Sequence, residues 1–325
     1  MQAFRFSQAK TVDGALDPES RFLAGGTTLI DLMKLDVETP ARVVDINRLP
    51  LARVEASADG GLKVGALVRN SDLAIHPEVK ARYAVLSEAL LSGASPQLRN
   101  MATTGGNLLQ RTRCYYFRDT AYACNKRQAG AGCSAMNGYN RIHAVLGGSE
   151  QCVATHASDM AVAMMALEAV VHTRGAQSGS GRERAIALDE FYLVPGTTPE
   201  REHVLEPGEL ITYVTLPKLP EGTRSHYVKL RDRAQYEFAL ASVAVVVTVK
   251  GDRVGRARIA LGGVATKPWR SREAESALEG KRVDEKNFRA AAEAAMRGAK
   301  PLRDNGFKIE LAKRALVRAL TVVTA

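Results

Sequence analysis

The chain has 325 residues, of which 46% are hydrophobic and 25% are charged. This length suits two or three domains, and the composition is that of a globular protein and excludes a disordered chain. The net charge is +10, and the stretch from Lys80 to His143 holds nine basic residues against two acidic ones. A basic stripe suits an anionic cofactor, an acidic partner protein or a nucleic acid. Because no nucleic-acid-binding motif accompanies it, we expect no nucleic-acid partner.

The sequence contains no apolar run near the roughly 18–20 residues that span a membrane, so we expect no membrane insertion. The longest apolar run, Ala241 to Val249, is β-branched and predicts a buried strand. The first residues show neither the apolar core of a signal peptide nor a twin arginine. We therefore expect the chain to carry no export signal of its own.

The first segment that suggests chemistry is a predicted strand, turn and helix over residues 21–34. Its turn contains Gly25 and Gly26, which allow the backbone to approach a ligand closely. The amides of residues 26–29 would then face an anion such as a pyrophosphate. The pattern is not G-x-G-x-x-G, and we do not expect the βαβ layout that accompanies that fingerprint. An ordinary strand-to-helix turn is the alternative.

A second glycine pair, Gly105 and Gly106, follows two threonines whose hydroxyls and amides suit phosphate oxygens. Further along, apolar residues recur at helical spacing from Met160 to Val171 and predict a buried helix. Ser158 or Asp159 would cap its N-terminus.

All four cysteines of the chain lie in a loop-like segment, residues 110–153, between these two features. Two disulfides, a zinc site, an iron–sulfur cluster and free buried thiols are the alternatives. The missing export signal counts against disulfides, and the missing C-x2–4-C pair counts against zinc. A [4Fe–4S] cluster accepts widely spaced thiolates and is favoured. Nearby basic residues would offset its negative charge: Arg113, Arg118, Lys126, Arg127 and Arg141.

Two histidines, His143 and His156, flank this loop, and we expect surface or capping roles for them rather than metal ligation. Residues 175–181 predict a flexible hairpin tip. Pro217, Pro220 and Gly222 indicate a domain boundary. Beyond it the pattern predicts strands at 226–231, 241–249 and 256–264, then helices near 270–279, 285–298 and 306–321.

Four sequence blocks, in order along the chain, resemble the FAD-binding medium subunits of molybdenum hydroxylases, the family of xanthine dehydrogenase, aldehyde oxidoreductase and carbon monoxide dehydrogenase. The blocks are residues 24–29, 42–46 with 61–67, 103–107, and 259–265 leading into 268–270. The cysteine segment and residues 230–240 are similar to those of the flavin and [4Fe–4S] subunit of bacterial periplasmic aldehyde oxidoreductase.

This resemblance implies an α+β fold, with a two-subdomain PCMH-type FAD-binding region followed by a C-terminal domain with a small antiparallel sheet and helices. We expect the FAD-binding region at 1–222, with subdomains at about 1–55 and 56–222 and the iron–sulfur loop at 110–153. The C-terminal domain would cover 223–325. The implied [4Fe–4S] ligands are Cys114, Cys124, Cys133 and Cys152.

The resemblance also implies FAD contacts at matching positions. Thr103, Gly106 and Asn107 would contact the phosphate or ribityl part, and Asp159 the ribityl or ribose hydroxyls. The residues that would wrap the pyrophosphate are Arg21, Phe22, Leu23, Ala24, Gly25, Gly26, Thr27, Thr28 and Leu29.

Further contacts are implied near the two ring systems of FAD. Ile211 would pack near the adenine. Lys229 would sit near the isoalloxazine, where a cation stabilises the reduced flavin, although a solvated lysine at a strand end is the alternative. The family's aromatic residue near the flavin could be Tyr115, Tyr116 or Tyr236.

In function, the resemblance implies an electron-transfer subunit with no catalytic residue of its own. A large molybdenum-cofactor subunit would oxidise an aldehyde, and a small subunit with two [2Fe–2S] clusters would pass the electrons to FAD. Oxygen, a ferredoxin-like protein or another carrier would accept them, and the [4Fe–4S] cluster would be a relay or a staple of its loop.

Several alternatives remain at this stage. They are a 4-hydroxybenzoyl-CoA reductase-like or xanthine dehydrogenase-like complex, a self-contained flavin oxidase and an iron–sulfur redox sensor. We expect assembly in the cytoplasm. The location would be periplasmic if a partner's twin-arginine signal exports the folded complex, and cytoplasmic otherwise.

Overall fold

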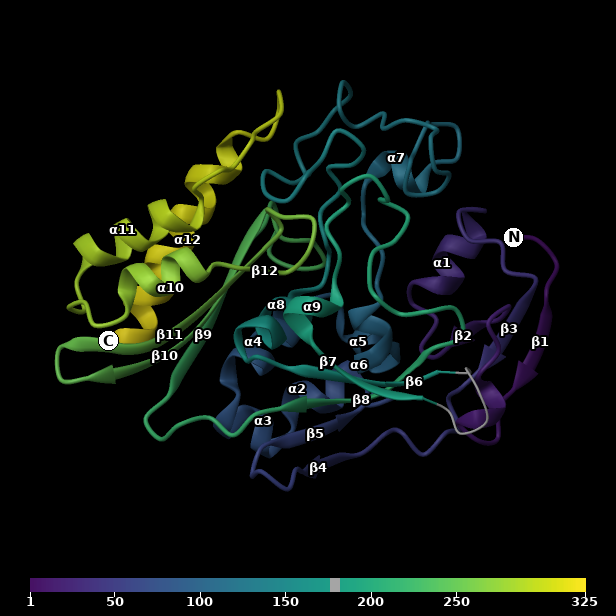
Figure 1. Ribbon diagram of the computed structural model, residues 1–325, viewed down its shortest axis with the longest axis horizontal. Helices are drawn as coiled ribbons and strands as arrows, with labels where there is room; N and C mark the ends of the chain where they lie inside the picture. The colour runs from purple at the N-terminus through teal and green to yellow at the C-terminus, as the bar shows by residue number, and fades with distance from the viewer. Residues whose placement is uncertain (176–181) are drawn as a thin grey trace.

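Three β-sheets organise the chain in the computed structural model, which describes residues 1–175 and 182–325 (Figure 1). The predicted hairpin tip lies, apart from Gly175, outside the described residues. No helix in the described part of the chain combines the length and the apolar character needed to cross a bilayer.

The first sheet is small and parallel, with strand order β1-β3-β2. Between β2 (Arg21–Leu23) and β3 (Arg42–Asp45) lies helix α1 (Leu29–Lys34), so these elements form a βαβ unit. The strand, turn and helix predicted over residues 21–34 are confirmed. Our expectation that a βαβ layout is missing is wrong, because the second strand, β3, has only four residues and is too short to leave a recognisable pattern. Strand β1 (Arg5–Gln8) completes the sheet, and a 3₁₀ turn covers Asp13–Ala15.

The second sheet is antiparallel, with strand order β4-β5-β8-β6-β7, and helices cover one of its faces (Figure 1). Its apolar side chains and those of the helices form the largest buried cluster among the described residues. The strands are β4 (Val54–Ala56), β5 (Leu62–Gly65), β6 (Val170–Arg174), β7 (Glu183–Ala187) and β8 (Leu210–Leu216). The helices are α2 (Asn70–Ile75), α3 (Pro77–Arg82), α4 (Ala84–Ser92), α5 (Pro96–Met101), α6 (Thr104–Leu108), α8 (Asp159–Ala166) and α9 (Leu188–Phe191).

Helix α8 is shorter than its apolar stripe predicts. It ends at Ala166, and Val171 lies on strand β6 instead. Glu168 has a positive φ of 56°, a conformation that does not continue a helix. The stripe is nonetheless buried throughout. Ser158 is the N-cap and accepts a hydrogen bond from the Ala161 amide at 2.9 Å, which leaves the Asp159 side chain free for other contacts.

The third sheet, with order β12-β11-β10-β9, is antiparallel, and helices α10, α11 and α12 form a separate apolar core with it. Every predicted strand and helix of this region is present, with its ends within three residues of the prediction. The elements are β9 (Arg224–Leu230), β10 (Ala241–Lys250), β11 (Arg253–Gly262), β12 (Trp269–Arg270), α10 (Arg272–Leu278), α11 (Glu285–Ala295) and α12 (Phe307–Thr324).

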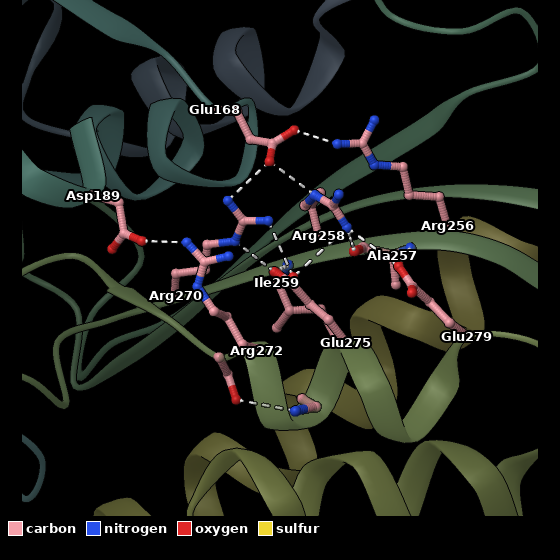
Figure 2. Close-up of polar contacts among 12 residues, drawn as sticks. Glu168, Asp189, Arg256, Ala257, Arg258, Ile259, Arg270, Arg272, Glu275 and Glu279 are labelled. Atoms are coloured by element: carbon pink, nitrogen blue, oxygen red, sulfur yellow. Dashed lines mark hydrogen bonds and ion pairs between the residues drawn. The ribbon is translucent and has the colours of Figure 1, made fainter. Parts of the chain in front are cut away.

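A charge network joins the end of α8 to this third sheet (Figure 2). The Glu168 carboxylate faces three guanidinium groups, those of Arg256 at 2.7 Å, Arg258 at 3.1 Å and Arg270 at 3.0 Å. Arg270 also pairs with Glu275 at 2.9 Å, and both of these side chains are only 6% exposed. These contacts fix the third sheet against the helices of the second.

Candidate functional site

The four cysteines line one cavity in the segment between α6 and α8, here called the cysteine cavity. Short helix α7 (Tyr115–Arg118) lies in this segment, which is otherwise irregular. Cys114, Cys124 and Cys152 are buried, Cys133 is partly buried, and all four are free thiols. Residues more than thirty positions apart thus meet at one place, and the disulfide alternative is not realised.

Polar contacts hold the cysteine segment in shape. The buried Asn125 side chain donates to the Gln151 carbonyl at 3.0 Å and accepts from the Gly132 amide at 2.7 Å. The Arg127 guanidinium donates to the Phe117 carbonyl at 2.8 Å and also to the carbonyls of Tyr116 and Tyr122. The segment is therefore an ordered wrapping around the thiols, although it has little regular secondary structure.

The four thiols all line the cysteine cavity. Among the described residues, no three His, Cys, Asp or Glu side chains are close enough to hold one metal ion. A tetrahedral zinc ion needs sulfur atoms about 2.3 Å from a single centre. A cubane has a separate iron for each thiolate and so fits a wider set. Burial raises the pKa of Cys114 to about 12 and also raises that of Cys152. Thiolates at these positions therefore need positive charge nearby.

The basic residues of this segment are mostly paired with carboxylates. Arg113 and Arg118 both contact Asp31, at 3.2 and 2.8 Å. Lys126 pairs with Glu202 at 2.9 Å, and Arg141 pairs with Asp232 at 2.7 Å. Of the five residues predicted to offset a cluster's charge, only Arg127 lacks a carboxylate partner among the described residues. Within the cysteine segment, the basic residues are therefore mostly engaged in ion pairs.

Glu202 is the most strongly held of these carboxylates. Burial alone would raise its pKa, but Lys126 and Arg111 outweigh burial and lower the pKa of Glu202 to about 2. Arg111 also binds Glu38, which follows α1. This network ties the cysteine segment to the first sheet.

A larger cavity, here called the central cavity, lies among the three sheet systems and measures about 1000 Å³ including its part open to solvent. Both glycine blocks, the start of α8 and strand β9 contribute predicted FAD contacts to its lining. The predicted residues in this lining are Thr27, Thr28, Gly106, Asn107, Asp159 and Lys229.

The two glycine blocks lie side by side at the edge of the central cavity. A Cβ atom on Gly25 would stand 1.9 Å from the Met101 carbonyl oxygen, so only glycine allows this approach. Thr103 caps α6 by accepting from the Gly106 amide at 3.3 Å. Asn47 fixes the backbone of the first glycine block, because its side-chain amide donates to the Ala24 carbonyl at 2.9 Å.

Lys229 and Asp159 form a nearly buried ion pair in the wall of the central cavity. Their charged atoms are 2.8 Å apart, and the two side chains are 3% and 9% exposed, so the solvated-lysine alternative is wrong. Lys229 also donates to the Ser92 carbonyl at 3.1 Å. Tyr227 donates its hydroxyl to Asp159 at 2.6 Å, and burial together with the Asp159 charge raises the pKa of Tyr227 well above its usual value. The ammonium is thus fixed in one position.

Three tyrosines were candidates for the aromatic residue near a flavin, and the structure separates them. Tyr236 lines the central cavity, Tyr115 lines a neighbouring cavity, and Tyr116 lines the cysteine cavity. Tyr236 has a positive φ of 54°, in the loop that follows β9. Of these three tyrosines, Tyr236 is the one that lines the central cavity.

Other predicted residues lie beside or away from the central cavity. Ala24, Gly25 and Gly26 connect β2 to α1, which begins at Leu29, and Arg21, Phe22 and Leu23 form β2 itself. Thr103 is buried beneath the second glycine block. Ile211 is buried in β8, in the core of the second sheet. The cofactor contacts assigned to all of these residues stay predictions.

Sequence reasoning missed Asn70, which lines the central cavity at the start of α2. Its side-chain oxygen is buried and has no hydrogen-bond partner among the described residues. A ligand rich in hydroxyl and amide donors, as a flavin dinucleotide is, fits such an orphaned acceptor. No sequence signal marks Asn70, because asparagine at a helix start is commonplace. Gln110 and Arg113 were missed for the cavity in the same way.

Comparison with known proteins agrees with this geometry. Residues 2–219 match the family model of the FAD binding domain in molybdopterin dehydrogenase, and residues 225–323 match that of the CO dehydrogenase flavoprotein C-terminal domain. The chain is 50% identical over 330 residues to the aldehyde oxidoreductase FAD-binding subunit PaoB of Escherichia coli, covering 100% of this chain and 99% of the relative. It is 28% identical to the carbon monoxide dehydrogenase medium chain of Hydrogenophaga pseudoflava, covering 98% and 94%.

A solved structure has the same fold. It is carbon monoxide dehydrogenase from Hydrogenophaga pseudoflava lacking the Mo-pyranopterin moiety, with a TM-score of 0.77, 28% identity, and coverage of 99% of this chain and 98% of that one. The sequence blocks, the fold and the relatives agree: the chain belongs to the FAD-binding medium subunits of the molybdenum hydroxylase family, as the flavin subunit of an oxidoreductase complex of the aldehyde oxidoreductase and carbon monoxide dehydrogenase type.

Proposed function

We propose that the chain is the electron-transfer flavoprotein of an aldehyde oxidoreductase. Electrons would arrive from [2Fe–2S] clusters of a small partner subunit, after a large molybdenum-cofactor subunit has oxidised the aldehyde, and leave for an external acceptor. The observation that carries this proposal is the central cavity, whose lining includes six predicted FAD contacts from three parts of the chain. The 50% identical relative is named as the FAD-binding subunit of an aldehyde oxidoreductase, which supports the substrate class.

The chain's own residues would bind and orient FAD, and the flavin supplies one- and two-electron transfer when bound. Thr27, Thr28 and Asn107 would hold its phosphate and ribityl parts, and the orphaned Asn70 oxygen would accept a hydrogen bond from it. Lys229 would hold a fixed positive charge against the flavin ring. The Asp159 carboxylate keeps that ammonium in place at 2.8 Å. Tyr236 would cover the ring.

We propose in addition a [4Fe–4S] cluster held by Cys114, Cys124, Cys133 and Cys152. Four free thiols that line one cavity support a site with four thiolate ligands, and the wide spacing of the cysteines in the sequence favours a cubane over a zinc ion. The ordered polar wrapping by Asn125 and Arg127 supports a site that is built for an occupant.

We further propose a division into an FAD-binding region at 1–222 and a C-terminal domain at 223–325. The break between β8 and β9 supports it. The complex would be assembled in the cytoplasm. It would become periplasmic only if a partner's twin-arginine signal exports it folded.

The first test is an anaerobic visible spectrum of the purified chain, with iron, zinc and flavin measured on the same sample. We expect flavin bands, an iron–sulfur shoulder and about four irons per chain, as cubane ligation implies. In the variant Cys124→Ser we expect the iron content to fall well below that value with the flavin content unchanged, because the two cavities are separate.

Tyr122→Phe is the matched control, because Tyr122 is an exposed residue of the same loop and the change keeps every thiol. Flavin without iron in the unmodified chain would overturn the cluster and leave the FAD proposal standing. Reduction of the isolated chain's flavin by an aldehyde would instead overturn the assignment of catalysis to a partner.

A further inference from the structure

A fully buried lysine lies beside the cysteine cavity without a counterion. Lys308, in the first turn of α12, has no exposed surface, and its ammonium donates to the carbonyl oxygens of Ile142 at 2.9 Å and His143 at 3.0 Å. Within the described residues no carboxylate pairs with it. Burying an ammonium costs free energy unless negative charge or hydrogen bonds compensate it. Burial lowers the pKa of Lys308 to about 7, and an anion in the neighbouring cavity would favour its charged form.

The imidazole of His143 bridges this lysine to the cysteine cavity. It is 1% exposed, and its Nε2 lies 3.1 Å from the Sγ of Cys114. Its other ring nitrogen, Nδ1, is buried and has no partner among the described residues. A thiolate can only accept a hydrogen bond. Beside a metal-bound Cys114, Nε2 therefore keeps its hydrogen and donates a hydrogen bond to the sulfur.

Residues just before α12 hold the backbone that carries this histidine. The Asn305 side chain donates to the carbonyls of His143 and Ala144, both at 3.3 Å. The Asn140 amide donates to Asp304 at 3.1 Å, and the Asp304 amide donates to the Asn140 side chain at 2.9 Å. The C-terminal part of the chain thus fixes the position of the imidazole.

The other basic side chains of the segment have different partners. Arg113 and Arg118 share the single carboxylate of Asp31, Lys126 faces Glu202, and Arg127 donates to backbone carbonyls. Lys308 and the His143 N–H act on the cysteine cavity from the side of Cys114, where the His143 Nε2 contacts the Sγ atom. Both groups favour the more negative state of a metal centre bound by the four thiolates.

We infer that His143 and Lys308 are positioning residues that raise the reduction potential of a [4Fe–4S] cluster in the cysteine cavity, His143 through its hydrogen bond to Cys114 and Lys308 through its buried charge. This rests on the proposed cluster. Reduction adds one electron and makes the cluster more negative. A donor to a ligating sulfur and a nearby cation therefore both favour the reduced form.

The test is a redox titration of the purified chain followed by electron paramagnetic resonance, with iron measured on each sample. His143→Phe keeps a ring but removes the N–H, and Lys308→Met keeps the length but removes the charge. We expect both to lower the midpoint potential while about four irons per chain remain. His143→Gln retains a side-chain N–H and should lie between His143→Phe and the unmodified chain. His172→Phe, a histidine stacked on Tyr213 in the second sheet, should change nothing.

Unchanged potentials in His143→Phe and Lys308→Met would overturn the inference and leave the cluster standing. Absence of iron from the unmodified chain would overturn the inference and the cluster together. If His143→Phe alone loses its iron, the midpoint potentials of His143→Gln and Lys308→Met test the inference instead. Lower potentials in both then support the inference, and unchanged potentials overturn it.

Discussion

At the scale of single residues, the adjacent Ser158 and Asp159 have different roles at the start of α8. Ser158 caps the helix through its hydroxyl, so Asp159 can turn its carboxylate to Lys229 and Tyr227. Both residues are good N-caps, and the sequence could not tell which one acts. The pairing partner of Asp159 lies 70 positions away and left no local signal. The Asp159–Lys229 pair in the cavity wall therefore depends on Ser158, and not Asp159, being the N-cap, which the sequence alone does not show.

We predict that Lys229→Met destabilises the chain by about 3 kcal/mol, because it leaves the Asp159 carboxylate nearly buried without its counterion. The measurement is the free energy of unfolding from urea denaturation of the flavin-free chain. FAD affinity should fall as well, since the fixed positive charge of the cavity wall is gone.

The double variant Lys229→Met with Asp159→Asn is the control, because it removes both charges. It should recover a large part of the lost stability. If the double variant is as unstable as the sum of the two single variants, the two side chains do not act as a pair.

At the scale of helices and strands, the sequence predicted best where patterns are long. The β-branched run at 241–249 became β10 (Ala241–Lys250), and the three C-terminal helices lie where their apolar spacing put them. Short elements were lost. Strand β3 has four residues and was not predicted. Strand β6 begins four residues after α8 ends, so the predicted helical stripe was extended too far, to Val171. A pattern shorter than about one period cannot separate helix from strand.

We predict that the contact between α8 and the third sheet weakens in acid. Burial raises the pKa of Glu168, but Arg258, Arg270 and Arg256 outweigh burial, so its pKa in the folded chain is lowered from 4.5. A group whose pKa is lower when folded contributes its stability above the unfolded pKa and loses it as the pH falls through the folded pKa. The contribution is therefore complete at pH 7 and declines below about pH 4.5.

The measurement compares the free energy of unfolding of the unmodified chain with that of Glu168→Gln at pH 7 and near pH 3.5. The variant should be less stable at pH 7, and the difference should shrink in acid. Because other carboxylates titrate equally in both proteins, the difference isolates Glu168. A difference independent of pH would show that its charge contributes nothing.

At the scale of the whole molecule, the central cavity draws on all three sheet systems. Thr27 belongs to the first, Asn107 to the helices over the second, and Lys229 to the third. The sequence pointed to these positions through family resemblance and offered no reason why they should meet. It missed the salt bridges of the cysteine segment altogether, because Arg113 and Arg118 find Asp31 more than eighty positions away.

We predict that FAD orders the three parts together. In hydrogen exchange of the full chain, adding FAD to the flavin-free protein should slow exchange in residues 24–29, 103–107 and 229–238 alike, since one ligand contacts all of them. The third sheet's distal helix α11 (Glu285–Ala295) serves as the internal reference and should not change. Protection confined to one of the three segments would mean that the ligand occupies only that part of the cavity.

The hydrogen bonds between Asn140 and Asp304 join residues 164 positions apart. Ribosomes add about 5–20 residues per second, so roughly ten to thirty seconds separate the synthesis of the two partners. During that interval the four cysteines already exist as nascent chain, while the residues that anchor His143 do not. Iron delivered in this window would meet thiols that are still accessible, and the arrival of α12 would then close the pocket behind it. The synthesis of α12 would thereby limit the time in which iron can reach the four thiols.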